Sequence, residues 1–484
     1  MSATEPSDSS LEGLTHAAST FAATLTFEAL PEEAVKLAKR CVIDGVGVAL
    51  AGSQQPGMQP LRQHIQRMGG VADSRLLADG EALPVAHAAL WFGTAGHAMD
   101  WDDTQLAEGP GRPYGLLMHP TMPPLAASLS VADYLARQQG ETVSGQRLLA
   151  AFMAGFEVGC KVAEAIAPSH YMRGFHTSGT VGTFAAAAAA ANMLQLDVPQ
   201  TAQALGIAAS MASGIRANFG TMTKPLHVGR AAENGVNAAM LSQVGFTAND
   251  TALDGQWGYL AVAGPGGESE RVRERFGNPF SLVSPGVSIK PYPSGVLTHP
   301  SMDALRSLME DEQLQPGDVA HVMLCAGSNV LGPIRFQRAM TPLEGKFSFQ
   351  FLLAAIILRG KVGTAEFTTE FVAGDECQQM QGLIETRFDQ GVEDLGWDKI
   401  RSRIELTTKD GKHYTRWADE RYRGGPDYPL SDDELEGKLR DCAANVLHPD
   451  TLDRLLGNIW RLDKLDNVTA MLDDLTEPAR TGGS

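Results

Sequence analysis

The stretch VGTFAAAAAAANML, residues 181–194, contains seven consecutive alanines, from Ala185 to Ala191. Alanine has the highest helix propensity, and its small side chain lets a neighbouring helix approach closely. The stretch therefore predicts a buried helix at the centre of the protein. Such a helix needs other helices around it, and the flanking sequence supplies them.

The pattern on both sides of this stretch, from residue 10 to about 263, is overwhelmingly helical. In residues 31–50, apolar side chains recur at helical spacing behind an early proline. After the Gly/Pro-rich residues 264–267, strand-like runs at 321–325 and 403–408 alternate with helical patterns at 301–310 and 347–359. We therefore predict a mainly α protein, in which residues 1–270 and 426–484 form a large all-helical domain and residues 271–425 form a smaller α+β domain.

Two local signals refine this division. The turn at residues 409–412 lies between two strand-like runs and predicts a β-hairpin. The acidic residues Asp432, Asp433 and Glu434 are typical of the first turn of a helix.

The composition excludes several classes of protein. With 43% hydrophobic and 20% charged residues, the 484-residue chain is typical of a compact globular protein. The 57 acidic residues outnumber the 39 basic ones, so the net charge of -18 disfavours nucleic acid and anionic membranes as partners. The most apolar run, 347–358, is too short to span a membrane. Because the N-terminus lacks the basic residues of a targeting sequence, we expect a cytoplasmic protein.

Neither the cysteines nor the standard cofactor motifs indicate a metal, a disulfide framework or a nucleotide. The five cysteines have no close pair, so we expect small buried side chains. The chain has no dinucleotide fingerprint, Walker A sequence, nucleophile elbow or His-Glu-x-x-His helix. Proton chemistry without a cofactor is the class of reaction that this leaves.

The first segment with candidate functional residues is 96–104, followed by His119. It places Asp100, Asp102 and Asp103 within four positions. Carboxylates so close together repel one another, so they are hydrogen-bonded structural groups, a cation site or part of an acid–base site.

The second segment precedes the alanine-rich helix and contains His176 among glycines and hydroxyl residues. The N-terminus of a helix attracts anions, so His176 is a candidate for carboxylate binding. The alternative is that Thr177, Ser178 or Thr180 caps the helix and His176 only packs beneath it.

Two further segments each place a lysine before a proline, at Lys224 and Lys290. A residue before proline favours an extended backbone, so we expect both lysines to be presented by turns. Solvated surface lysines are the alternative. Two rigidly presented lysines in an acidic protein indicate an anionic substrate, bound at the domain junction.

Together these segments resemble the MmgE/PrpD family. The resemblance is carried by residues 97–104, 174–176, 181–183, 223–229, 290–293 and 346–349, whose order and spacing extend through nearly the whole chain. It implies an all-helical domain, an α+β lid, an active site between them and a homodimer. The positions that match active-site groups of the family are Asp100, Thr104, His119, His176, Lys224 and Lys290.

The resemblance implies a small di- or tricarboxylate as substrate, with no cofactor and no metal. Lys224 and Lys290 are expected to neutralise substrate carboxylates, while His119 and His176 exchange protons. Asp100 is expected to orient a histidine or to bind a substrate hydroxyl. The remaining predicted contacts to the substrate come from Thr104 and His227.

We predict a lyase that dehydrates a hydroxy acid similar to 2-methylcitrate or citrate, or decarboxylates an acid similar to aconitate. The alternative is an epimerase of a dicarboxylate such as iminodisuccinate, with Tyr171 and Lys224 on opposite faces of one carbon. A non-catalytic carboxylate-binding subunit is a third hypothesis, which the pair of histidines argues against. Two features differ from the decarboxylase branch: residues 326–330 contain no equivalent of its lid tyrosine, and the loop 105–118 is longer.

Overall fold

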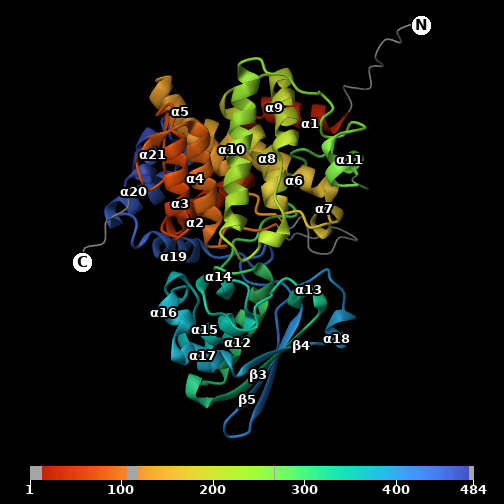
Figure 1. Cartoon of the computed structure of the whole chain (residues 1–484), viewed down its shortest axis with the longest axis vertical. Helices are drawn as coiled ribbons and strands as arrows, with labels where there is room; N and C mark the ends of the chain where they lie inside the picture. The colour runs from red at the N-terminus through yellow and green to blue at the C-terminus, as the bar shows by residue number, and fades with distance from the viewer. Residues whose placement is uncertain (1–12, 106–117, 266–267, 479–484) are drawn as a thin grey trace.

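The computed structural model describes residues 13–105, 118–265 and 268–478, so most of the loop 105–118 lies outside the described residues. The fold is mainly α, as predicted, and has only a two-stranded and a four-stranded sheet in this part of the chain. Figure 1 shows a large helical part above a smaller α+β part. The predicted domain limits at residues 271 and 425 stay predictions.

The alanine-rich stretch forms the central helix α8 (Thr177–Met193), and its seven alanines are fully buried. Helices α5 (Met122–Gln138), α6 (Gly145–Ile166) and α10 (Thr223–Gln243) pack around it. The packing is close enough that a Cβ atom on Gly235 of α10 would lie 2.4 Å from the Cβ of Ala186. The prediction of a buried central helix is confirmed.

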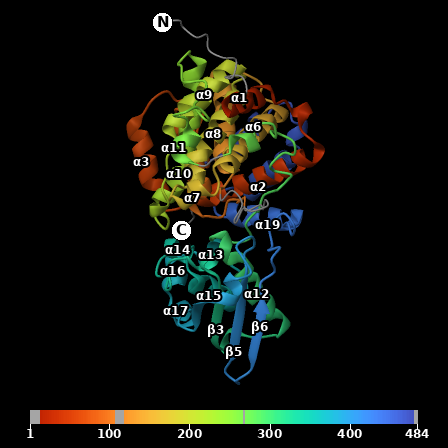
Figure 2. The ribbon, with the colours of Figure 1, turned by 90° about the vertical axis from the view of Figure 1, so that its right-hand side faces the viewer.

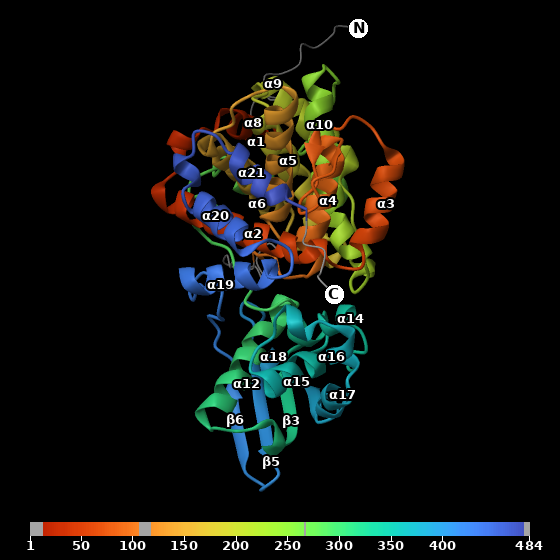
Figure 3. The same cartoon turned by 90° about the vertical axis from the view of Figure 1, so that its left-hand side faces the viewer.

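The rest of the helical part comes from both ends of the chain. The N-terminal elements are α1 (Leu14–Thr24), α2 (Glu32–Ser53), α3 (Met58–Met68), β1 (Ser74–Arg75), β2 (Ala82–Leu83), α4 (Val85–Ala98), α7 (Ser169–Met172), α9 (Val198–Met211) and α11 (Tyr259–Ala263). The C-terminal helices α19 (Asp432–Ala443), α20 (Pro449–Trp460) and α21 (Thr469–Thr476) return to pack on α2 and α5, as Figure 3 shows. The short antiparallel pair β1 and β2 was not predicted.

The α+β part contains a four-stranded sheet in the order β4-β3-β5-β6. Strands β3 (Val319–Ala326) and β4 (Ile384–Phe388) are parallel, and the other pairs are antiparallel. The predicted hairpin is confirmed as β5 (Ser402–Thr408) and β6 (His413–Trp417), which points away from the helical part in Figure 2. The helices of this part are α12 (His299–Asp311), α13 (Ser328–Leu331), α14 (Pro342–Gly345), α15 (Phe349–Arg359), α16 (Thr369–Ala373), α17 (Asp375–Gln381) and α18 (Gln390–Glu393).

Two findings bear on expectations from composition. All five cysteines are free and buried, as expected. Among the described residues, no helix combines the length and the apolar character that crossing a bilayer would require.

Candidate active site

The site begins where helix α4 ends, at residues 98–104. Asp100 follows with a φ angle of 54°, a left-handed conformation that costs an L-residue about 1–2 kcal/mol and that aspartate adopts more readily than most. This turn sends the side chains of Asp100, Asp102 and Asp103 to different partners, although all three carboxylates are buried. The carboxylate cluster noted in the sequence is thereby separated into three environments.

The carboxylate of Asp100 accepts hydrogen bonds from two buried lysines, from Lys224 Nζ at 2.6 Å and from Lys290 Nζ at 3.2 Å. Burial raises the pKa of Asp100, but the two ammonium groups outweigh it, so the pKa lies below its ordinary value. Burial lowers the pKa of Lys224 even though Asp100 opposes the shift. Asp100 was expected to orient a histidine or to bind a substrate hydroxyl; its hydrogen-bond partners in the structure are the two lysines.

Two packing features bring these lysines together. Helices α4 and α10 touch through glycines, since a Cβ atom on Gly93 would lie 2.9 Å from the Cα of Gly229, and this places the start of α10 beside the end of α4. Lys290 lies near Asp100 because Thr104 and Ser288 exchange backbone hydrogen bonds of 2.9 and 2.8 Å, which join the two segments.

The prediction of an extended backbone conformation at Lys224 was wrong. Lys224 lies in the first turn of helix α10 and not in an extended turn. The first turn of a helix tolerates proline because its N–H groups have no partner within the helix, so Pro225 does not prevent helix formation. Lys290 does lie outside helices and strands, as expected.

Asp102 is the carboxylate that contacts histidines. It accepts from Nδ1 of His97 at 2.9 Å and lies 3.3 Å from Nδ1 of His119, which also donates to the carbonyl of Asp103 at 2.8 Å. Burial raises the pKa of Asp102, but the two imidazoles hold it well below its ordinary value. Burial in turn lowers the pKa of His97 to about 3. His97 is therefore a neutral imidazole at physiological pH.

Asp103 has a structural environment. Its carboxyl accepts hydrogen bonds from the hydroxyl of Thr121 at 2.5 Å and from the backbone N–H of Thr121 at 3.3 Å. Burial raises its pKa well above the ordinary value, and the nearby carboxylates of Asp44 and Asp102 add to the shift. This carboxyl therefore holds a proton more tightly than a solvated aspartic acid does.

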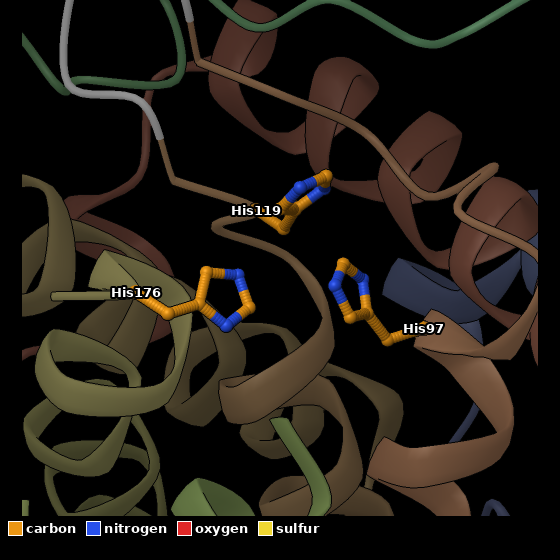
Figure 4. A group of neighbouring side chains, drawn as sticks. All are labelled: His97, His119 and His176. Carbon is orange, nitrogen blue, oxygen red and sulfur yellow. The ribbon is translucent and has the colours of Figure 1, made fainter. Parts of the chain in front are cut away.

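His176 precedes the first residue of α8 and does not cap the helix with its side chain. Its Nδ1 lies 3.0 Å from Nδ1 of His227, and burial lowers its pKa well below the ordinary value. Ser178, one of the alternative caps, instead accepts a hydrogen bond of 2.9 Å from the backbone N–H of His119. Figure 4 shows the rings of His97, His119 and His176 facing one another.

These residues surround one cavity of about 80 Å³ between the helical and α+β parts. Seven of the eight predicted site residues line it: Asp100, Thr104, His119, Tyr171, His176, Lys224 and Lys290. The eighth, His227, is not in the lining and contacts His176. The apolar lining comes from Phe219, Val296, Leu297, Pro333, Ile334 and Phe347, with Gly295. Pockets for drug-sized ligands have volumes of about 300–1,000 Å³, so this smaller cavity suits a compact molecule.

One hydroxyl in the cavity has no partner. Among the described residues, Thr104 Oγ1 is buried and makes no hydrogen bond. A buried hydroxyl without a partner costs about 1–3 kcal/mol, which a polar group of a ligand would recover. This fits the predicted contact between Thr104 and the substrate.

The predicted set of site residues omitted three participants, His97, Asp102 and Lys346, although the candidate segment 96–104 contains the first two. Lys346 is buried, donates a hydrogen bond of 2.6 Å to the carbonyl of Ala98, and has its pKa lowered to about 8 by burial. The signal was present, since Lys346 begins one of the segments that resemble the family and His97 begins another.

Two groups of side chains have the composition of a metal site. His97, His119 and His176 each place a ring nitrogen within 4.8 Å of the others, and His97, Asp100, Asp102 and His119 form a second group. Such donors suit a transition metal. Burial is the largest cause that lowers the pKa of His97 and of His176, and the charge of Lys224 adds to it, whereas Asp102 opposes the shift at His97. These imidazoles are therefore neutral nitrogen donors that lie between carboxylates and ammonium groups.

Models of one protein family match most of the chain. A model described as the MmgE/PrpD N-terminal domain matches residues 16–271, and one described as the MmgE/PrpD C-terminal domain matches residues 292–462. The cis-aconitate decarboxylase of Homo sapiens is 28% identical over 463 residues, which cover 93% of this chain and 92% of the relative. The cis-aconitate decarboxylase of Mus musculus is 27% identical, and the match covers 93% of this chain and 91% of the relative. That of Aspergillus terreus is 25% identical, and the match covers 95% of each chain.

Proposed function

The chain belongs to the MmgE/PrpD family, and on that premise we propose that it is a lyase that acts on a compact di- or tricarboxylic acid without a cofactor. The observation that carries this proposal is the meeting of two buried lysines and two imidazoles on one small cavity. Relatives at 25–28% identity are named cis-aconitate decarboxylases, so decarboxylation of an aconitate-like acid is the first reaction we propose. Dehydration of a citrate-like hydroxy acid is the second.

Lys224 and Lys290 supply the positive charge for the substrate. Both ammonium groups bind Asp100, and both side chains reach the cavity lining. A carboxylate of the substrate would add to this set of charges and would be recognised by hydrogen bonds to cations, which are about twice as strong as neutral ones. Thr104 and His227 are the predicted additional binding residues.

His119 and His176 are proposed to move the proton. In a decarboxylation, the bond between carbon and the leaving carboxylate breaks, its electron pair stays on the substrate, and the substrate carbon takes one proton while carbon dioxide leaves. The lysines stabilise the negative charge that develops on the remaining carboxylates. Binding of an anion beside an imidazole raises the pKa of the imidazole, so the substrate itself helps a histidine to acquire the proton it donates.

A dehydration would use the same groups in another order. One imidazole removes a proton from the carbon beside a carboxylate, and the other protonates the hydroxyl that leaves as water. The product is an unsaturated acid, and the electrons balance without an oxidant.

Proton NMR in deuterated water tests the proposal. The purified enzyme is incubated with cis-aconitate, citrate, 2-methylcitrate and iminodisuccinate in separate samples. Loss of carbon dioxide from aconitate supports a decarboxylase, and a new vinyl signal from a hydroxy acid supports a dehydratase. No change in any of the four samples would contradict the proposed substrate class.

One observation supports an epimerase as second candidate. Tyr171 lines the same cavity as Lys224, and burial raises the pKa of its phenol, so the phenol stays protonated at neutral pH. A phenol and an amine facing one carbon can return and remove a proton. Deuterium exchange at the α-carbon without a change of skeleton would favour this reading, and Tyr171→Phe should then abolish racemisation but not binding.

We also propose a homodimer, which the resemblance to the family implies. Light scattering after size-exclusion chromatography should give twice the chain mass of 51.6 kDa. A mass of one chain at micromolar concentration would contradict this.

A further inference from the structure

Three buried lysines bind the backbone of one short segment at the end of helix α4. Their ammonium groups donate hydrogen bonds to carbonyl oxygens within residues 98–101: Lys346 to Ala98 at 2.6 Å, Lys290 to Asp100 at 2.7 Å and Lys438 to Trp101 at 2.8 Å. Only Lys290 among them was expected from the sequence to take part in the site. The other two are buried charges for which substrate binding gives no explanation, since neither lines the cavity.

The segment needs such partners for two physical reasons. The last carbonyls of a helix have no partner within it and carry partial negative charge, so cations stabilise that end. Asp100 follows with its left-handed backbone, and a strained residue keeps its conformation only where the surroundings fix it. The three hydrogen bonds lie on both sides of Asp100 and on Asp100 itself.

The three lysines come from different parts of the fold. Lys438 belongs to α19 and also binds Asp44 at 2.5 Å and the carbonyl of Lys290 at 2.9 Å, so it joins helical elements to the segment that carries Lys290. Lys346 follows α14 in the α+β part. Its hydrogen bond to Ala98 therefore connects the α+β part to the end of α4.

Lys346 is also placed to affect the cavity. The next residue, Phe347, lines the cavity, and its ring packs on that of Phe219 with centroids 6.4 Å apart. Movement of Lys346 away from Ala98 would shift an apolar wall of the cavity and release the residue that precedes Asp100 by two positions.

We propose that Lys346 is a positioning residue, whose hydrogen bond to the Ala98 carbonyl joins the α+β part to helix α4 and fixes Asp100 between Lys224 and Lys290. The proposal deepens the proposed function, and its kinetic consequence rests on that function. Its structural consequence does not, because the hydrogen bond joins two groups of the protein itself.

The charge of Lys346 depends on the groups that surround it. Burial lowers its pKa to about 8, Asp100 and Asp102 oppose this shift, and Lys224 and Lys290 add to it. Above that pH the neutral amine is a weaker donor to the carbonyl. The positioning should therefore weaken in mildly alkaline solution.

Hydrogen exchange of the free protein tests the structural part. The variants are Lys346→Met, Lys346→Arg and the control Lys361→Met, which removes an exposed lysine of the same part. At neutral pD we expect amides within residues 98–104 to exchange at least tenfold faster in Lys346→Met, and within threefold of the natural protein in Lys346→Arg and in the control. Unchanged exchange in a Lys346→Met protein with native circular dichroism would overturn the proposal.

The pH profile tests the functional part, with any acid of the panel that the enzyme converts. Arginine keeps its charge in alkaline solution, so Lys346→Arg should move the alkaline limb of kcat/KM upward by at least one pH unit. An unmoved limb would leave Lys346 with a purely structural role and overturn the positioning of Asp100.

The pD dependence of hydrogen exchange in the natural protein and in Lys346→Arg gives a further test. It applies even if Lys346→Met does not fold or the enzyme converts no acid of the panel. Exchange within 98–104, corrected for the intrinsic pD dependence, should rise between pD 7 and 9.5 in the natural protein and not in Lys346→Arg. Equal behaviour of the two proteins would contradict the proposal. Because this readout needs no substrate, its result separates failure of the positioning from failure of the proposed function.

Discussion

Asp100 and Asp102 are two residues apart and have carboxylate oxygens within 4.8 Å of each other, but the two carboxylates bind different partners. We call the half with Asp100, Lys224, Lys290 and Lys346 the lysine side, and the half with Asp102, His97, His119 and His176 the histidine side. On the lysine side, burial is compensated by pairing full charges, with 2.6 Å between Lys224 and Asp100. On the histidine side, burial lowers the pKa of His97 and His176, so these imidazoles stay neutral.

The difference suggests a division of labour. Lysine ammonium groups bind an anion but exchange protons poorly near neutral pH. An imidazole exchanges protons well once its pKa is brought close to the pH of the solution. We therefore expect changes on the lysine side to affect substrate affinity and changes on the histidine side to affect turnover. The predictions below test this contrast.

The largest effect is expected from His176→Ala. Loss of a proton-transfer group lowers kcat by about 10²- to 10⁴-fold, while KM should change by less than about fivefold. Steady-state kinetics on the acid identified by NMR measures both. His321→Ala, which removes a half-buried histidine of β3 that does not line the cavity, is the matched control and should match the natural enzyme. A rise in KM with unchanged kcat would assign His176 to binding and remove the contrast.

The next effect concerns stability and compares the two neighbouring carboxyls Asp102 and Asp103. Asp102→Asn removes the charged acceptor of the hydrogen bond from His97 and should cost about 1.5–3 kcal/mol of unfolding free energy. Asp103→Asn keeps an acceptor for Thr121 and should cost less than about 1.5 kcal/mol. Urea unfolding at pH 7 measures both. Equal losses would show that the histidine side does not hold a distinct charged carboxylate.

The contributions of Asp102 and Asp103 to folding stability should depend on pH in opposite directions. The folded-state pKa of Asp103 is raised, so its contribution to stability is present below the unfolded value of about 3.9 and is lost as pH rises toward the folded pKa. The folded-state pKa of Asp102 is lowered, so its contribution is present above about 3.9 and is lost as pH falls. As the pH rises above about 3.9, the natural protein should therefore lose stability relative to Asp103→Asn. A constant difference would contradict the raised pKa.

Lys224→Met comes third. It removes one charged hydrogen bond, worth about 1.5–3 kcal/mol, and should raise KM by roughly 10- to 150-fold with a smaller change in kcat. The exposed lysine Lys361 offers a control, since Lys361→Met should leave KM unchanged. If kcat fell as steeply as in His176→Ala while KM stayed constant, Lys224 would be a proton-transfer group, and the two sides would not differ in role.

The fold was more accessible from the sequence than the site. Periodicity and the alanine run are local signals, so they located α8 and the hairpin of β5 and β6 correctly. The sequence did not predict that Lys224 and Lys290 both bind Asp100. Asp100 and Lys224 are 124 positions apart in the chain, and only the packing of α4 on α10 brings them together.

Local rules also failed at two points of the site. The rule that a residue before proline is extended gave the wrong backbone for Lys224, because it is only a steric preference, and in the first turn of α10 Pro225 breaks no helical hydrogen bond. The pair of His97 and Asp102 spans a left-handed turn at Asp100, a conformation with no periodic signature. The segments that resemble the family did contain both residues, but resemblance alone did not tell which would touch.

The smallest predicted effect is the uptake of a fraction of a proton when an anion binds. It tests whether negative charge bound on the lysine side raises the pKa of imidazoles on the histidine side. An unreactive tricarboxylate such as tricarballylate should bind on the lysine side and bring negative charge next to His119 and His176. Because burial keeps the pKa of His176 below its ordinary value in the free enzyme, the anion can only raise it, and binding should take up protons. Calorimetry at pH 6.5 in buffers of different ionisation enthalpy should detect an uptake of roughly 0.3–1 proton per site, reduced in His176→Gln. Binding without uptake would mean that the imidazoles do not sense the anion, and the lysine side would then bind substrate without preparing the histidine side for proton transfer.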